Sequence, residues 1–324
     1  MKRLLVNDCL TCIPGTRTFW HDLQEWFGLE FRGGDYSVLS LTDVRDASLV
    51  IRNATWFPAF EARVPTISLL QDIIESGPTR DMQEQVIRSS AVVCFNSEYT
   101  KSKYATYMSA VGVEFGVKDV PPDVRYRVIP LPVDFALFTP GDSVAARHKL
   151  SLPDGCVCWV GASRGAAGHV KGWDVFMQIV RLNPDLPFVA VLKDEMPNLM
   201  PPNLRCFVRL SHEELVDVYR ACRVGLCTSR QETQHLAGIE MGACGLPMVA
   251  PPVGCYYGRD ELGFPGVAID MADTTKVAIA LRSNMKPSVE PNDIRDFWRA
   301  EFDKPVIRAK WQALIEEVEC SGQS

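Results

Sequence analysis

Two glutamates with seven residues between them lie in the segment 224–254, which has the pattern of a strand, a polar loop, a helix and a second strand. Glu232 falls in the polar loop, and Glu240 falls about one turn inside the helix, which is predicted to begin at His235 or Leu236. The first amides of that helix lack partners within the helix and favour an anion. A carboxylate beside them can accept two hydrogen bonds from a ribose diol while the amides hold phosphate. The spacing therefore predicts a nucleotide site, whereas a lone glutamate would more simply be a solvated residue on a helix face.

Short apolar, β-branched runs alternate with longer helical patterns along the chain, and these are the elements that must position the two glutamates. Apolar character that is continuous rather than alternating suits strands buried on both faces of a parallel sheet. Residues 212–222 have helical periodicity, with Ser211 as the N-cap and Glu214 completing a capping box. The repeated β–α alternation predicts an α/β, doubly wound architecture. The predicted strands are 4–7, 37–41, 48–52, 66–70, 91–95, 126–131, 156–161, 188–192, 204–208, 224–228 and 247–250.

The pattern of strands and helices restarts after the turn-forming residues 139–155. A chain of 324 residues exceeds the roughly 250–300 residues of one hydrophobic core, so two domains are expected. The sequence predicts one Rossmann-like domain over 1–140 and a second over 150–290. The last stretch, 291–324, is helical and amphipathic, and Pro305 must break or kink it.

Composition narrows the possible classes of protein. A hydrophobic content of 47% with 23% charged residues excludes a disordered or fibrous chain, and a net charge of −6 argues against gripping a polyanion with the whole surface. No apolar run reaches the roughly 18 residues of a membrane span, and the N-terminus lacks the apolar stretch of a signal peptide. Five of the eleven cysteines fall in strand-like runs, and an odd count in a long chain without a signal peptide favours a reducing, cytoplasmic location. Cys9 and Cys12 form a C-x-x-C pair that cannot complete a zinc site alone.

Several strings, taken in order, resemble a known family. Glu232 and Glu240 are followed by ACGLPMVA (243–250) and preceded by SHEELVDVYRACRVGLCTS (211–229), and further matches are WVGASRGAAGHVKGWDVFMQIV (159–180), VIPLPVDFALFTP (128–140) and FNSEYTKSKY (95–104). The sequence is similar to the retaining nucleotide-sugar glycosyltransferases of the GT-B fold that carry an E-x7-E motif, the glycosyl transferases group 1 type. The resemblance implies two Rossmann-like domains facing a cleft. It assigns the acceptor to 1–140 and the donor to 150–290, with the helical residues 291–324 crossing back onto the first domain and burying Trp298 and Trp311 there.

The resemblance also implies which cations offset the charge of a departing nucleoside diphosphate. Lys171, in Lys171-Gly172, matches a family lysine. Ala162 occupies the usual position of a family arginine, and Arg164, two residues later, is expected to replace it. Such cations stabilise negative charge in the transition state. Gly161 is expected to let the backbone approach the phosphate.

The two glutamates receive separate roles from the resemblance. Glu240 is expected to bind the donor ribose, and Glu232 to lie near the hydroxyls of the donor sugar. The amides of Leu236 and Ala237 correspond to the family's phosphate-binding amides. His235 stands where the family often has a glycine, so the local loop geometry is expected to differ.

The first domain is expected to hold the acceptor. Asp72, in LLQDI, is the candidate polar contact to the acceptor or to the reacting sugar, with Gln71 in place of the usual histidine, or it is a helix N-cap. Arg52 and Asn53 end a predicted strand and are expected to line the cleft. Glu232, Asp72, Lys171 and Arg164 are thus the candidate catalytic residues.

The activity implied is transfer of a sugar from a nucleotide-diphosphate sugar to an acceptor hydroxyl with retention of configuration. No Asp-x-Asp metal motif is evident, so we expect no metal and no cofactor. The acceptor stays open among a glycan, a lipid, a small molecule and a modified nucleobase, as does the oligomeric state. Two alternatives are a nucleotide-sugar epimerase of the same fold and a non-catalytic nucleotide-sugar-binding protein.

Overall fold

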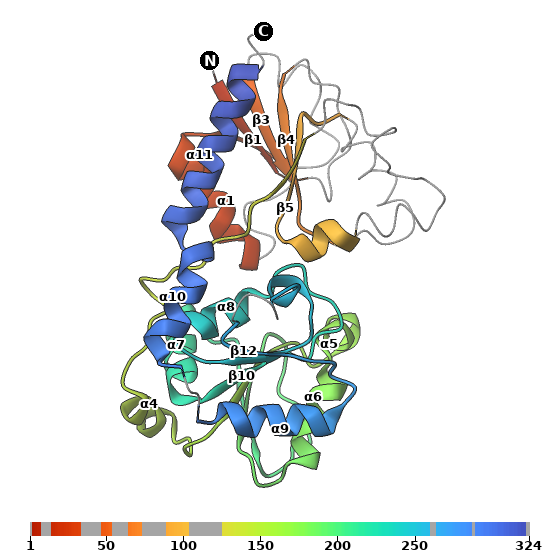
Figure 1. Cartoon of the computed structure of the whole chain (residues 1–324), viewed down its shortest axis with the longest axis vertical. Helices are drawn as coiled ribbons and strands as arrows, with labels where there is room; N and C mark the ends of the chain where they lie inside the picture. The colour runs from red at the N-terminus through yellow and green to blue at the C-terminus, as the bar shows by residue number, and fades with distance from the viewer. Residues whose placement is uncertain are drawn as a thin grey trace, which may run out of the picture. The chain divides into compact units, whose positions relative to one another are not determined.

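The computed structural model of the chain contains two compact units, one formed by Met1–Pro132 with Pro305–Ser324 and the other by Val133–Lys304. Within the described residues each unit is built on a six-stranded parallel sheet (Figure 1). The predicted strand 37–41 and the pair Cys9 and Cys12 lie outside the described residues. The structure describes residues 2–7, 14–33, 47–53, 64–72, 89–103, 125–259, 264–286 and 289–321.

The first sheet has the strand order β2-β1-β3-β4-β5-β6. Its central strands β4 and β5 are buried on both faces, as the continuous apolar runs predicted, and Leu4, Leu5 and Ile51 are fully inaccessible. Helix α1 (Pro14–Phe27) follows β1 and buries Phe19 and Leu23. The strands are β1 (Lys2–Asn7), β2 (Glu30–Gly33), β3 (Ala47–Asn53), β4 (Thr66–Leu70), β5 (Val92–Phe95) and β6 (Arg125–Val128).

The last helix, α11 (Lys304–Ser321), belongs to the first unit and runs beside β1 (Figure 1). Trp311 is fully buried and lies 6.1 Å from the ring of Phe19. Glu317 accepts hydrogen bonds from Arg127, at 2.8 and 3.1 Å, and Glu319 accepts two from Arg3, at 2.8 and 2.9 Å. An apolar stripe and a set of ion pairs therefore hold this distant segment against the sheet.

The second sheet has the order β12-β11-β10-β7-β8-β9 and carries helices on both faces. Cys158 packs in a cluster with residues of α7, α8 and α10, whereas its neighbour Trp159 packs in a separate cluster with residues of α6 and α9. Successive side chains of a strand point to opposite faces, so this second unit is doubly wound, as predicted. Its strands are β7 (Val157–Gly161), β8 (Phe188–Leu192), β9 (Leu204–Val208), β10 (Val224–Leu226), β11 (Met248–Ala250) and β12 (Gly266–Ala268). Its helices are α4 (Ser143–Leu150), α5 (Gly165–Lys171), α6 (Trp173–Leu182), α7 (His212–Ala221), α8 (Leu236–Ala243), α9 (Thr274–Asn284) and α10 (Pro291–Phe302).

Helix α10 differs from the expectation that all of 291–324 joins the first domain. It lies in the second unit, where the fully buried Trp298 packs so closely on Gly242 of α8 that a Cβ atom there would collide with the indole ring. Asp303 separates α10 from α11, so the predicted break falls next to Pro305. The sequence did not reveal that Trp298 and Trp311 pack in the cores of different units, because the apolar residues around each tryptophan have the same helical periodicity.

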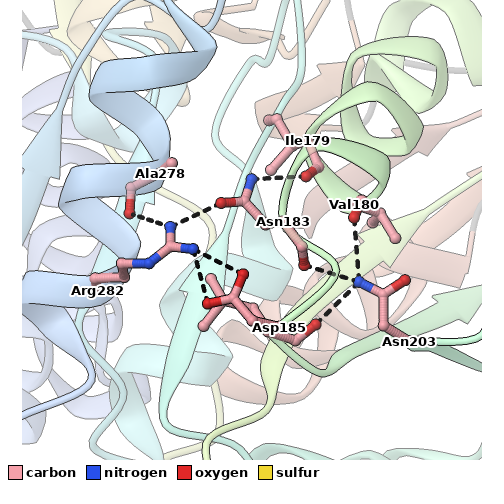
Figure 2. A network of polar contacts seen from close by, with 8 residues as sticks. Ile179, Val180, Asn183, Asp185, Asn203, Ala278 and Arg282 are labelled. Carbon is pink, nitrogen blue, oxygen red and sulfur yellow. Dashed lines mark hydrogen bonds and ion pairs between the residues drawn. The ribbon is translucent and has the colours of Figure 1, made fainter.

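The amino-terminal edge of the second sheet is held by a polar network (Figure 2). Arg282 of α9 donates to both carboxylate oxygens of Asp185, at 2.9 Å each, and to the side-chain oxygen of Asn183, at 2.7 Å. The amide nitrogen of Asn203 donates to the carbonyls of Val180, Asn183 and Leu186, as Figure 2 shows in part. These bonds fix the turn that enters β8, so the polar side chains at this edge stabilise the fold.

The cysteines that the structure describes carry free thiols. Cys94, Cys156, Cys158 and Cys206 are buried within or next to strands, where a thiol packs as a small apolar group. Cys320 of α11 is exposed.

Candidate functional site

The order of the second sheet reverses between β7 and β10. The chain runs outward from β7 through β8 to β9, and then returns to β10 on the other side of β7 before continuing to β11 and β12. In open α/β sheets, ligands bind beyond the carboxyl ends of the strands at such a switch point. The loops that follow Gly161 and Leu226 are therefore the candidate site. Together with the helices α5 and α8 that continue them, they hold most of the residues that the sequence singled out.

Lys171 and Glu232 meet at this point although 61 residues separate them in the chain. The Nζ of Lys171 lies 2.6 Å from Oε1 of Glu232, and the hydroxyl of Ser229 donates to the same oxygen at 2.7 Å. Burial alone would raise the pKa of Glu232. The charge of Lys171 opposes burial, and the pKa of Glu232 lies below its ordinary value. Glu232 is therefore a buried, ionised acceptor.

The backbone at Lys171 is held by Thr228, which lies in the loop after β10. The hydroxyl of Thr228 donates to the carbonyls of Lys171 and Gly172, at 3.0 Å each, and accepts from the indole nitrogen of Trp159, at 2.9 Å. Gly172 has a left-handed φ of 68°, and a Cβ atom there would collide with the carbonyl of Thr228. The glycine after Lys171 therefore permits the close approach that places the lysine.

Arg230 is a residue of this site that the sequence did not single out. Its guanidinium donates to both oxygens of Asp174, at 2.8 and 2.7 Å, and to the carbonyl of His169 at 2.7 Å. Its main-chain nitrogen donates to the carbonyl of Val170 at 2.8 Å. These bonds fasten the loop after β10 to the end of α5, and hydrogen bonding from Arg230 lowers the pKa of Asp174 to about 2. No sequence motif marks Arg230, because its partners come from another part of the chain.

His235 is the N-cap of α8, so the predicted helix start is confirmed. It has a left-handed φ of 65°, which is uncommon outside glycine, and its Nδ1 lies 2.7 Å from the hydroxyl of Tyr256. Burial lowers the pKa of His235 to about 4, so the ring is neutral near pH 7. The amides of Leu236 and Ala237 open the helix and precede its own hydrogen bonds, which leaves them suited to an anion.

Glu240 lies one turn inside α8, as the sequence predicted. Its Oε2 accepts a hydrogen bond of 2.9 Å from the hydroxyl of Tyr219 on α7, while Oε1 accepts none from the described residues. Burial raises the pKa of Glu240, and the Tyr219 hydrogen bond opposes that rise. The hydroxyl of Tyr219 orients the carboxylate, a contact that the helical periodicity of 212–222 did not indicate.

Arg164 is engaged in contacts with residues 194 and 195 in this structure. Its side chain is exposed and forms an ion pair of 2.6 Å with Glu195. Its main-chain nitrogen, like that of Ser163, donates to Asp194, at 2.9 and 2.8 Å. This loop follows Gly161, the last residue of β7, where a Cβ atom would collide with the ring of Trp159. Packing thus explains that glycine, and contacts of Gly161 and Arg164 with a phosphate stay predictions.

One group of described residues has the composition of a metal site. The nearest ligand atoms of Cys227, Glu232 and His235 lie within 4.8 Å of one another, and all three residues are buried. Lys171 already neutralises Glu232, and burial raises the pKa of the Cys227 thiol to about 12. A cation would have to displace the ammonium and a proton, so the group fits a hydrogen-bonded ligand better than a metal.

In the first unit, Asp72 is exposed two residues beyond the end of β4, and Gln71 is buried. Whether Asp72 caps a helix depends on residues 73–88, which lie outside the described residues. The expectation that Arg52 and Asn53 line a cleft is wrong, since both are buried. Arg52 donates to Ser68 and Ser89, at 2.8 Å each, and burial lowers its pKa to about 10.

Solved structures share this architecture. Sucrose-phosphate synthase from Thermosynechococcus elongatus matches with a TM-score of 0.72 at 15% identity, over 99% of this chain and 100% of that one. Anabaena Alr3699/HepE, solved in complex with UDP and glucose, matches with a TM-score of 0.71 at 13% identity, over 98% and 99% of the two chains. The fold is GT-B.

Sequence relatives point to the same group as the GT-B fold. The D-inositol 3-phosphate glycosyltransferase of Stackebrandtia nassauensis is 35% identical over 183 residues, which are 48% of this chain and 40% of the relative. That of Acidothermus cellulolyticus is 29% identical over 191 residues, or 53% and 43% of the two chains. The chain thus spans half or less of the length of the curated relatives it matches. No family model matches the sequence.

These findings confirm the resemblance to GT-B glycosyltransferases of group 1. Among the described helices of this GT-B chain, none has both the length and the apolar character of a membrane span.

Proposed function

We propose that the chain is a glycosyltransferase that moves a sugar from a nucleotide-diphosphate sugar to an acceptor hydroxyl, with retention of configuration and without a metal. The observation that carries the proposal is the Lys171–Glu232 pair at the switch point of the second sheet. It stands beside the start of α8 and on the same loop-helix segment as Glu240. The glycosyltransferase names of the sequence relatives and the complexes of HepE with UDP and UDP-glucose support it.

In the proposed reaction the second unit binds the donor and the first binds the acceptor. Lys171 turns from Glu232 toward the diphosphate, where it and the amides of Leu236 and Ala237 stabilise the leaving charge. Glu232, once released, accepts hydrogen bonds from hydroxyls of the donor sugar. Glu240 uses Oε1 for the ribose diol while Tyr219 holds Oε2.

The acceptor hydroxyl attacks the anomeric carbon from the face that the diphosphate leaves. The bond from that carbon to the phosphate oxygen breaks, the new glycosidic bond forms, and the hydroxyl proton passes to the departing phosphate oxygen. Asp72 contacts the acceptor or the reacting sugar from the first unit, and Arg164 assists the diphosphate if it leaves Glu195. Because Lys171 and the helix amides supply the positive charge, the reaction needs no metal.

A thermal-shift panel of UDP, GDP, ADP and their sugars identifies the donor, because a ligand that binds the native state raises its stability. Transfer from that donor is then measured across an acceptor panel for the parent, Lys171→Ala and Glu240→Ala. Both variants should stay folded and lose most transfer. Unchanged turnover in both would refute the proposed roles. Isomerisation of the donor without an acceptor would indicate the epimerase, and nucleotide binding without any transfer would indicate a binding protein.

A further inference from the structure

Lys193 is the first residue after β8 and stands at the carboxyl edge of the sheet, next to the switch point. Its main-chain nitrogen donates to the carbonyl of Gly161 at 2.9 Å, and the carbonyl of Leu192 accepts from Arg209 at 2.9 Å. Leu192 pairs with Gly161 of β7 on one side and with Val208 of β9 on the other. Lys193 therefore flanks the same loop that carries Arg164.

The ammonium of Lys193 is uncommitted among the described residues. It forms no hydrogen bond or ion pair there, and the side chain is accessible to solvent. The cations already described at this edge are engaged: Lys171 with Glu232 and Arg164 with Glu195, at 2.6 Å each, and Arg230 with Asp174, at 2.8 and 2.7 Å. An unpaired ammonium beside engaged cations is the group most available to a new anion.

The charge of Lys193 acts on the groups of the candidate site. Burial raises the pKa of Glu240 and lowers that of His235, and the positive charge of Lys193 acts on both groups by favouring ionised Glu240 and neutral His235. Desolvation by the surrounding protein lowers the pKa of Lys193, and the positive charge of Lys171 lowers it further. The negative charges of Glu232 and Glu240 oppose that fall. Lys193 after β8, Lys171 of α5 and Glu240 of α8 are thus close enough for their charges to interact.

The charge balance of that region leaves a role for one more cation. Lys171 brings a single positive charge to the diphosphate, which carries more than one negative charge, and Glu232 keeps its own negative charge nearby. Part of the ligand's charge is therefore left for another cation. A buried or partly buried phosphate needs charge-assisted hydrogen bonds to replace its hydration. Arg164 would first have to break its pair with Glu195, whereas Lys193 has no such pair to break.

We propose that Lys193, rather than Arg164, is the second cation that binds the diphosphate of the donor. This assignment rests on the proposed function only for the identity of the ligand as part of a sugar donor. Lys193 makes its contact in the ground state as well as in the transition state, so it contributes chiefly to binding.

The test compares Lys193→Met, Lys193→Arg and Arg164→Gln with the parent by calorimetric titration. Arg181→Gln is the matched control, because Arg181 is an exposed cation in the last turn of α6. The probes are UDP, GDP and ADP, the matching nucleosides, and inorganic pyrophosphate as a probe that needs no base. Thermal unfolding of each variant shows that it is folded.

Lys193→Met should weaken diphosphate and pyrophosphate binding by about 10- to 100-fold, the range of one charge-assisted hydrogen bond. Nucleoside binding should stay unchanged, and Lys193→Arg should keep most of the affinity. Arg164→Gln should lose less affinity than Lys193→Met does, and Arg181→Gln should bind as the parent does. The loss should shrink at high salt, since the contact is ionic.

Parent-like diphosphate binding by Lys193→Met overturns the assignment, as does an equal loss of diphosphate and nucleoside affinity. The assignment and the proposed function fail separately. Weakened diphosphate binding with no sugar transfer from any nucleotide sugar supports Lys193 and overturns the proposed function. Sugar transfer by the parent, with diphosphate binding by Lys193→Met equal to that of the parent, supports the proposed function and overturns the assignment of Lys193. Absence of any diphosphate binding by the parent overturns both.

Discussion

The ammonium of Lys171 lies 2.6 Å from a carboxylate oxygen of Glu232, so the principal cation and anion of the site neutralise each other before a ligand arrives. The carboxylate is 8% exposed and also accepts from Ser229. A ligand that carries both an anion and hydroxyl donors can replace each partner at once. The pair is thus suited to a phosphate joined to a sugar, and poorly suited to either one alone.

Lys171→Met should destabilise the chain, because it leaves the Glu232 carboxylate buried without its cation. We expect a loss of about 3 kcal/mol in the free energy of unfolding, the scale for breaking a buried pair. The double variant Lys171→Met/Glu232→Gln should recover most of it. Urea unfolding measures both. Equal stability of the single and double variants would show that the pair is not coupled.

Tyr219→Phe should raise the pKa of Glu240, since the tyrosine hydroxyl stabilises the ionised carboxylate. Ribose binding requires that carboxylate as an acceptor, so affinity for the nucleoside diphosphate should fall off at a higher pH than in the parent. The measurement is a titration of affinity against pH. Tyr257→Phe, at an exposed position, is the control. Superimposable pH profiles for Tyr219→Phe and the parent would argue against the role of Tyr219.

His235 should make the chain less stable in acid. Its pKa is 6.5 when unfolded and about 4 in the folded protein, so the unfolded chain binds the extra proton first. The contribution of His235 to stability is therefore complete above pH 6.5 and is lost as the pH falls toward 4. Unfolding titrations between these values should show this slope in the parent and lack it in His235→Gln.

His235→Gly should be less destabilising than His235→Ala. Both variants lose the hydrogen bond to Tyr256, but alanine alone keeps the strain of a left-handed φ. That strain is about 1 kcal/mol. Urea unfolding of the two variants gives the difference, and alanine as stable as glycine would mean that the backbone relaxes at this N-cap.

Gly172→Ala should cost more stability than Gly155→Ala. Both glycines have a left-handed φ, 68° and 77°, but only at Gly172 would a Cβ atom collide with a backbone carbonyl, that of Thr228. Gly155→Ala therefore measures the strain alone, at about 1 kcal/mol. Gly172→Ala should also weaken donor binding, because it displaces Lys171. If the two variants lost stability and donor affinity equally, the close approach of Gly172 to Thr228 would have no part in placing Lys171.

The sequence alone determined the repeating units of the fold and the parts of the site that are local. Continuous apolar runs predicted strands buried on both faces, and the helix that carries Glu240 was predicted to start where it does. Ser211 and Glu214 form the predicted capping box. Such features depend on residues a few positions apart, and hydrophobic periodicity and capping chemistry record those directly.

Only the tertiary structure decided which charged groups meet. The strand order brings the end of α5 to the loop after β10, and so pairs Lys171 with Glu232. It also engages Arg164 with Glu195 and leaves Lys193 unpaired among the described residues. Arg52 has the same residue type as a cation of the site, yet it is buried among serines. A charged residue's role follows from its neighbours in space, and the packing of distant elements chooses those neighbours.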